Sequence, residues 1–275
     1  MMLLVDLVFQ STPDIAGLVL PATLAERYFD ATTAIGTLLQ FAAFGIPLAG
    51  MVGLLHLLHR RGFWSLIGDP QAAWLDLRRV TFAVVLLLLA LDLLPPWAGA
   101  VDGAEMRNPA LWLALMPAAL LALLVQVSAE EMFFRGYLQQ QLACLTPARW
   151  VWMGVPSALF GLVHYWNGFG AADGAVWAIW AALLGLACAD LTARTGNLGA
   201  AIGLHLANNM LAVLLFGVQG WPASGLALFT YPYADPDTLA APLSSLLSLG
   251  AVVHLLIQAA SVYVMWLTAR IAIRR

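Results

Sequence analysis

The sequence has no lysine, few charged residues and only two cysteines. Charged residues make up 10% of the 275 positions and hydrophobic residues 62%, whereas an ordinary soluble domain has roughly 25% charged and about 45–50% apolar residues. With a mean hydropathy of +0.86, the chain has too little polar surface to cover a water-soluble particle. This excludes a soluble globular enzyme, a disordered chain and a collagen-like chain. Cys144 and Cys188 form no metal-binding or redox motif, and nothing suggests a disulfide scaffold.

All 12 basic residues are arginines, against 15 acidic residues, so the net charge is −3. No more than two arginines are adjacent, which argues against a nucleic-acid partner and against a polybasic tail that binds lipid headgroups. The N-terminus has no positively charged segment, and Asp6 precedes any long apolar run, so we do not expect a cleaved signal peptide. The composition predicts a polytopic membrane protein that is surrounded by the lipid bilayer.

A membrane-spanning helix needs about 20 predominantly apolar residues. Residues 1–24 are apolar but interrupted by acidic residues and prolines, so we expect an interfacial segment there, with an eighth span as the alternative. The stretch 219–242 is rich in proline and glycine and is predicted to be a loop or a re-entrant element. Because no repeat or shift in composition marks a second domain, we predict an all-α fold, a single integral-membrane domain (1–275) of seven to eight spans. The seven predicted spans lie near residues 33–58, 80–99, 109–129, 151–166, 175–193, 197–218 and 243–268.

The arginines predict the orientation, because cytoplasmic loops of membrane proteins carry an excess of basic residues. With seven spans, nine arginines fall on one side of the membrane, only Arg27 and Arg107 fall on the other, and Arg135 lies within a helix. We therefore expect a multi-pass protein of the bacterial inner membrane whose C-terminus is cytoplasmic. An eighth span would move only the N-terminal tail.

The apolar run near residues 109–129 is followed, without a break in the helical pattern, by Glu130, Glu131 and Arg135. Inserting an ionisable side chain into a bilayer costs on the order of 2.5–3.5 kcal/mol of free energy, so each such residue indicates a specific role. Glu131 and Arg135 are four residues apart, which places them on one helix face where they can pair. Glu130 points about 100° away from Glu131 and is outside this pair. The alternative is a helix end at the lipid headgroups, where the three charges are merely solvated.

Two further polar motifs lie in later apolar segments. His164 stands late in one of them, and His205 and Asn209 share a helix face in another because they are four residues apart. Glu130 and His164 are about equally far from a predicted turn around Thr146 and Pro147, roughly 25 Å of helix, and His205 lies roughly 16 Å from the same side. We therefore expect these groups to meet in a polar intramembrane cavity that is open to the cytosol. The alternatives are a buried core histidine and hydrogen bonds between helices.

These side chains suffice for hydrolysis of a peptide bond without a covalent intermediate. Glu130 beside a neutral His164 can hold and activate a water molecule. His205 and Asn209 can donate hydrogen bonds to the oxyanion that forms on the attacked carbonyl. In the alternative, Glu130, His164 and His205 are ligands of a catalytic zinc ion with water in the fourth position. The spacing alone does not separate the two mechanisms.

The three motifs together resemble those of the CPBP family of intramembrane proteases. This family includes the type II CAAX prenyl endopeptidases (Rce1-like, also called Abi) and bacterial relatives that process bacteriocins or confer self-immunity. The resemblance covers residues 125–215, which contain all three motifs. The family pattern is E-E-x-x-x-R, F-x-x-x-H and H-x-x-x-N, matched here by Glu130, Glu131 and Arg135, by Phe160 and His164, and by His205 and Asn209.

The resemblance implies a bundle of about eight spans with a cavity that is open to the cytosol. It also implies that Glu130 and His164 activate water, that His205 and Asn209 form the oxyanion site, and that Glu131 with Arg135 supports them. The resemblance favours a mechanism without a cofactor. It also implies that the substrates of this protein are CAAX-type (prenylated) or other membrane-associated peptides and proteins.

Two hypotheses from other functional classes stay open at this point. A proteolytically silent member of the family would act as a membrane scaffold or a bacteriocin-immunity protein by binding a partner in the bilayer. A small carrier would use Glu130, His164 and His205 as a proton relay. Against the carrier, the sequence has neither an internal repeat nor the paired broken helices of many secondary transporters.

Overall fold

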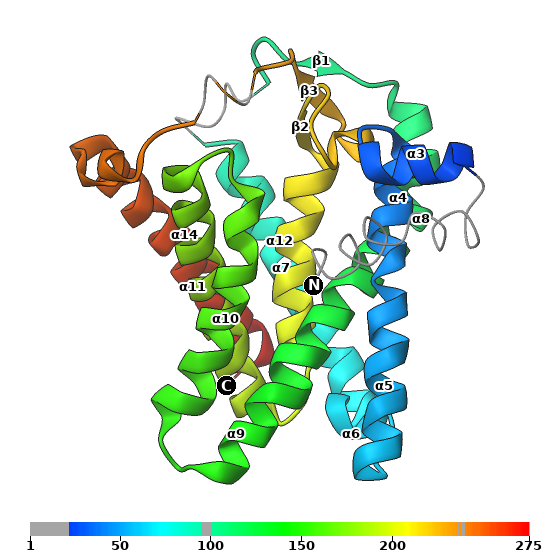
Figure 1. The fold of residues 1–275 in the computed structure, drawn as a ribbon, viewed down its shortest axis with the longest axis vertical. Helices are drawn as coiled ribbons and strands as arrows, with labels where there is room; N and C mark the ends of the chain where they lie inside the picture. Colours follow the sequence, from blue (N-terminus) through cyan, green and yellow to red (C-terminus); the bar gives the residue numbers. More distant parts are fainter. Residues whose placement is uncertain (1–21, 95–100, 236, 238–239, 275) are drawn as a thin grey trace. The chain divides into compact units, whose positions relative to one another are not determined.

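The structure is a computed structural model, and helices make up most of it (Figure 1). The predicted all-α class of a membrane-type helical bundle is confirmed. The predicted interfacial segment 1–24 lies outside the described residues up to residue 21, so neither this segment nor the alternative eighth span is tested. The described residues are 22–94, 101–235, 237 and 240–274.

Four of the described helices or runs of helices are long and apolar enough to cross a membrane. They coincide with four of the predicted spans and identify an integral membrane protein, whereas the exact number of spans stays a prediction. The four are Ala34–His59 (α4, Ala34–Ala43, and α5, Gly45–His59), Pro109–Leu145 (α8, Pro109–Glu131; η2, Met132–Gln139; and α9, Gln140–Leu145), Ala171–Thr195 (α11) and Leu249–Ile273 (α14).

The chain divides into two compact units, each assembled from separate stretches of sequence. The first unit consists of Met1–Arg60, Leu88–Glu130 and Asn208–Ala234, and the second of Arg61–Leu87, Glu131–Ala207 and Asp235–Arg275. The prediction of a single domain over the whole chain stays a prediction. Short helices among the described residues include α3 (Ala22–Asp30) and η5 (Ser224–Leu226) in the first unit, and α6 (Trp64–Ile67), η4 (Tyr165–Asn167) and η6 (Leu243–Leu247) in the second.

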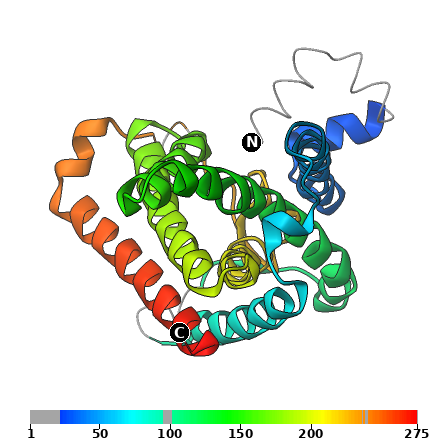
Figure 2. The same ribbon diagram turned by 90° about the horizontal axis from the view of Figure 1, so that it is seen from below.

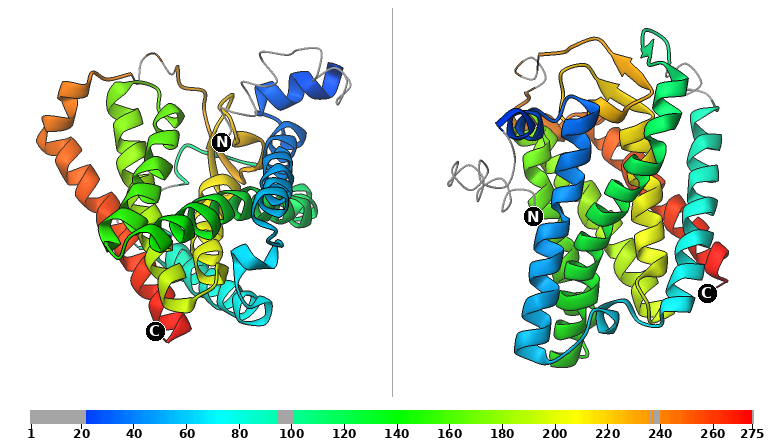
Figure 3. Two further views of the ribbon diagram at one scale, coloured as in Figure 1. Left: turned by 60° about the horizontal axis from the view of Figure 1, so that its bottom comes forward. Right: turned by 90° about the vertical axis from the view of Figure 1, so that its right-hand side faces the viewer.

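A small three-stranded sheet belongs to the first unit (Figure 3). Strand β3 (Phe229–Tyr231) lies between β1 (Glu105–Met106), to which it is antiparallel, and β2 (Phe216–Val218), to which it is parallel. The prediction of a loop or re-entrant element over 219–242 is therefore wrong in part, because this stretch contains β3. Strands of two or three residues are too short to produce the alternating pattern by which a strand is recognised in a sequence.

Helix α7 (Pro70–Asp92) of the described chain begins ten residues before the predicted span 80–99. Asp69 caps its first turn, because its Oδ1 accepts a hydrogen bond from the Ala72 N–H at 2.7 Å. Asp76 on the same helix accepts a hydrogen bond from Asn197 Nδ2 at 3.0 Å. A search for apolar residues misses this polar first part of the helix.

A helical hairpin forms part of the second unit. Helix α9 ends at Leu145, and the π-helix η3 (Trp150–Gly154) leads into α10 (Val155–His164). The turn thus lies at the predicted position near Thr146. Gly161 of α10 makes a close approach to α11 possible, because a Cβ at this position would lie 2.4 Å from the carbonyl oxygen of Ala178.

Helix α11 also packs closely against other neighbours within the second unit. A Cβ at Gly185 would lie 2.8 Å from Arg135 Nη2 and 3.2 Å from the side chain of Ser157. Helix α14 lies along α11 (Figure 2), and Trp266 Nε1 on α14 donates a hydrogen bond to Asp190 Oδ2 on α11 at 2.9 Å. Because Gly185 has no Cβ, it leaves the space in which the Arg135 side chain lies.

Candidate active site

The predicted pair of Glu131 and Arg135 forms in the second unit, where α8 ends and the π-helix η2 begins. Arg135 Nη1 donates a hydrogen bond to Glu131 Oε1 at 2.9 Å, and both side chains are fully buried. A π-helical segment within an α-helix is frequently found at a functional site. The spacing of four residues predicted the contact between Glu131 and Arg135 correctly, although the local helix is not a regular α-helix.

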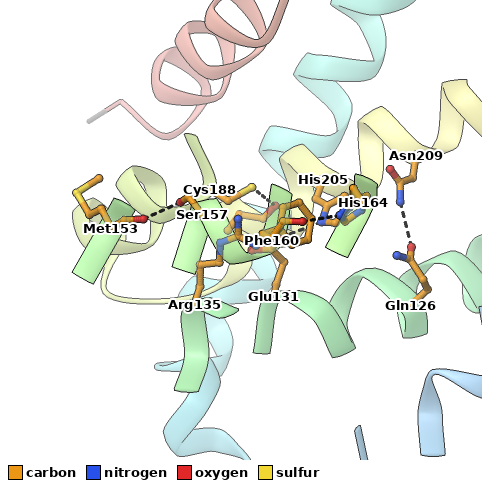
Figure 4. Close-up of polar contacts among 11 residues, drawn as sticks. Gln126, Glu131, Arg135, Met153, Ser157, Phe160, His164, Cys188, His205 and Asn209 are labelled. Carbon is orange, nitrogen blue, oxygen red and sulfur yellow. Dashed lines mark hydrogen bonds and ion pairs between the residues drawn. The ribbon is translucent and has the colours of Figure 1, made fainter. Parts of the chain in front are cut away.

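His205 on α12 (Gly199–Leu214) binds the same oxygen of Glu131 (Figure 4). Its Nδ1 lies 2.8 Å from Glu131 Oε1, and its side chain is only 3% exposed. Because a carboxylate that is paired with a guanidinium group accepts hydrogen bonds, Nδ1 carries the hydrogen. This bond fixes the orientation of the imidazole and makes Nε2 the nitrogen that can act on a ligand.

His164 is held in a similar way by the backbone of its own helix. Its Nδ1 lies 2.7 Å from the carbonyl oxygen of Phe160. A carbonyl oxygen can only accept, so Nδ1 again carries the hydrogen of this bond. In a neutral ring the other nitrogen, Nε2, is then the acceptor, which is the form a group needs in order to take up a proton or hold a water molecule.

The ring of Phe160 contacts three of the polar groups in the second unit. Its centroid lies 4.4 Å from that of His164, 5.6 Å from that of His205 and 4.6 Å from Arg135 Cζ. A guanidinium group at this distance from an aromatic ring makes a favourable cation–π contact. Phe160 itself is 1% exposed. The phenylalanine of the F-x-x-x-H motif therefore packs the two histidines and the arginine around one apolar ring.

Asn209 belongs to the first unit, where two other amides bind its side chain. Asn209 Nδ2 donates a hydrogen bond to Gln126 Oε1 on α8 at 3.0 Å (Figure 4). Asn208 Nδ2 donates one to Asn209 Oδ1 at 3.1 Å. Gln126 is buried. Gln126 was not among the predicted site residues, although an amide inside an apolar run, four residues before Glu130, was a visible signal.

The predicted site residues are thus divided between the two units. Glu131, Arg135 and His205 are joined by direct contacts in the second unit, where His164 packs against the same Phe160 ring as His205. Glu130 belongs to the first unit with Asn209 and is a buried residue, 7% exposed. The meeting of both glutamates, both histidines and the asparagine in one catalytic centre stays a prediction.

The zinc alternative and the predicted substrate cavity also stay predictions. Within the described part of the chain, no three histidine, cysteine or acidic side chains are grouped so that they could hold a metal ion. A cavity of about 390 Å³ in the second unit is lined by Arg135, Gln139 and Asn197 among others, but the residues that line it include neither His164 nor His205. This cavity is therefore distinct from the one predicted at the histidines.

Comparisons with known proteins bear directly on these motifs. Residues 112–211 match the family described as type II CAAX prenyl endopeptidase Rce1-like, which confirms the predicted resemblance. The uncharacterized protein YyaK of Bacillus subtilis (strain 168) is 31% identical over 200 residues, covering 70% of this chain and 65% of YyaK. The matched region is thus just under two thirds of that relative's length. No solved structure matches the chain.

Proposed function

We propose that this integral membrane protein, whose residues 112–211 belong to the Rce1-like family of type II CAAX prenyl endopeptidases, hydrolyses a peptide bond with a water molecule activated by Glu130 and His164. At family level the assignment is that of a CAAX-type intramembrane protease. The catalytic residues, the substrate and the mechanism go beyond the family assignment and form the proposal.

The contact between His205 and Glu131 is the observation that carries the proposal. An acid, a guanidinium group and an imidazole are buried together, at exposures of 0% for Glu131 and Arg135 and 3% for His205. Buried ionisable groups in an apolar helical bundle are costly and mark functional sites by default. The bond from Nδ1 to Glu131 fixes the orientation of the His205 ring, and in the proposed reaction a ring with hydrogens on both nitrogens donates its Nε2–H to the oxyanion.

The proposed reaction follows from these roles. Glu130 removes a proton from the water molecule that His164 helps to hold, and the oxygen attacks the carbonyl carbon of the scissile bond. The negative charge that develops on the carbonyl oxygen is stabilised by hydrogen bonds from His205 and Asn209. Glu130 then transfers the proton to the leaving nitrogen, the C–N bond breaks, and an acid and an amine are released.

We infer the substrate class from the family and from the apolar sequence around the motifs. We propose CAAX-type prenylated peptides or other membrane-associated peptides and proteins, cleaved near the cytosolic face. The arginine distribution supports this side, because it predicts a cytoplasmic C-terminus.

Cleavage of a prenylated CAAX-type reporter and of a general peptide library, by purified protein in detergent or lipid, tests the proposal. The reaction is measured with and without the chelator phenanthroline. We expect cleavage at a rate that the chelator leaves unchanged. A rate that falls with chelator and returns with zinc would replace the glutamate mechanism by the zinc alternative. If folded wild-type protein cleaves none of the peptides, the protease proposal is wrong and the scaffold or immunity hypothesis is favoured.

Asn209→Ala is expected to slow turnover of the same reporter by on the order of a hundredfold, which is the usual effect of removing one oxyanion donor. The reason is that the Nδ2–H group is lost from the position where negative charge develops. The measurement is kcat and KM, and we expect the loss in kcat. An unchanged kcat would remove Asn209 from the mechanism.

A further inference from the structure

The side chain of Asn209 is bound at both ends of its amide by neighbours within the first unit. Asn208 donates to Oδ1 at 3.1 Å. Gln126 Oε1 accepts one Nδ2 hydrogen at 3.0 Å (Figure 4). A primary amide has two N–H donors, so the second Nδ2 hydrogen is the one that Asn209 can give to a substrate. Asn209 is half-buried, which leaves its amide within reach of a ligand.

The orientation of this amide decides whether it helps or hinders the reaction. Rotation of the side-chain amide by 180° exchanges the nitrogen and the oxygen, and the oxygen would repel a developing oxyanion. Gln126 is 6% exposed and lies on α8, an apolar helix, where an amide without a partner would cost about 1–3 kcal/mol. Its carbonyl therefore remains paired with Asn209 and holds Nδ2 in one place.

We propose that Gln126 is a positioning residue, which acts through Asn209 by turning the Nδ2–H group toward the oxyanion. This inference rests on the oxyanion role proposed above for Asn209. Gln126 itself needs no contact with the substrate, so its effect falls on the rate of the chemical step and leaves substrate binding unchanged.

Two replacements of similar size test the role of the acceptor atom. Gln126→Met removes it, and we expect kcat to fall roughly tenfold to a hundredfold, by no more than in Asn209→Ala, with KM unchanged. Gln126→Glu keeps a carbonyl oxygen that accepts a hydrogen bond from Asn209, and we expect it to retain more of kcat than Gln126→Met. If Gln126→Glu is as slow as Gln126→Met, the proposed direction of the hydrogen bond is wrong.

Gln40→Met is the matched control in the same unit. Gln40 is also a buried glutamine, and its Nε2 donates a hydrogen bond to the backbone oxygen of Tyr28 at 2.9 Å. The chemical change is thus the same, at a site outside the proposed machinery. We expect Gln40→Met to keep the wild-type kcat. Thermal unfolding of all variants in detergent shows whether the loss in Gln126→Met exceeds that of a structural glutamine.

A double variant separates positioning from a general structural effect. In the Asn209→Ala background, Gln126→Met should cause no further loss of kcat, because the group on which Gln126 acts is gone. Additive losses, or a wild-type kcat in Gln126→Met alone, would overturn the proposal while leaving the proposed function intact. A wild-type kcat in Asn209→Ala would instead contradict the oxyanion assignment itself.

Discussion

Glu130→Ala is expected to abolish peptide hydrolysis, while the protein still inserts into membranes and purifies as the wild type does. General acid–base groups typically contribute 10²–10⁴-fold to a rate, and Glu130 is proposed both to deprotonate the water and to protonate the leaving nitrogen. The residue is 7% exposed, so bulk water cannot easily take over either step. The measurement is turnover of the prenylated reporter, together with thermal unfolding and elution from a sizing column.

Glu105→Ala is the control for this variant. It makes the same change in the same unit, at an exposed carboxylate that accepts a hydrogen bond from Gln219 Nε2 at 2.9 Å. We expect its turnover to match that of the wild type. If Glu130→Ala retains turnover within tenfold of the wild type, Glu130 is not the group that activates the water.

Arg135→Met is expected to lower the free energy of unfolding by about 3–5 kcal/mol, the usual cost of removing one partner from a buried ion pair. The loss arises because the carboxyl group of Glu131, which is fully buried, would lose the guanidinium group that compensates its charge. We also expect slower turnover, since Glu131 orients His205 through the 2.8 Å contact. Reversible unfolding in mixed detergent micelles measures the free energy.

Two further variants make this prediction specific. Arg194→Met breaks another arginine–acid pair with the same spacing, in which Arg194 and Asp190 are 39% and 23% exposed, and the expected loss is less than about 1 kcal/mol. The double variant Glu131→Gln with Arg135→Met removes both charges and should recover most of the stability lost in Arg135→Met. Equal losses in Arg135→Met and Arg194→Met would show that burial does not control the strength of these pairs.

Contacts between residues close in sequence were predictable, because helical spacing alone determines them. Glu131 and Arg135 are the clearest case, and the turn near Thr146 followed from the distance between two apolar segments. The apolar segments themselves predicted the fold class, since a chain with 62% hydrophobic residues has few other ways to bury its backbone polar groups.

Contacts between distant residues were not predictable from one sequence. Glu131 and His205 are 74 positions apart, and Gln126 and Asn209 are 83 apart. Each contact depends on how helices pack, which neither periodicity nor composition specifies. The sheet was missed for another reason, because β1 has only two residues and pairs with a strand more than a hundred positions away.

Gly185 limits how far this sequence can diverge while keeping its function. It belongs to none of the three motifs, yet any larger residue there would push against the Arg135 guanidinium group, 2.8 Å from the position of a Cβ. Arg135 and His205 share one oxygen of Glu131, so a displaced arginine would also move the histidine. Comparison of relatives by their motifs alone would overlook this dependence, and a member with every motif residue in place but a bulky side chain at this position would retain the signature without the geometry.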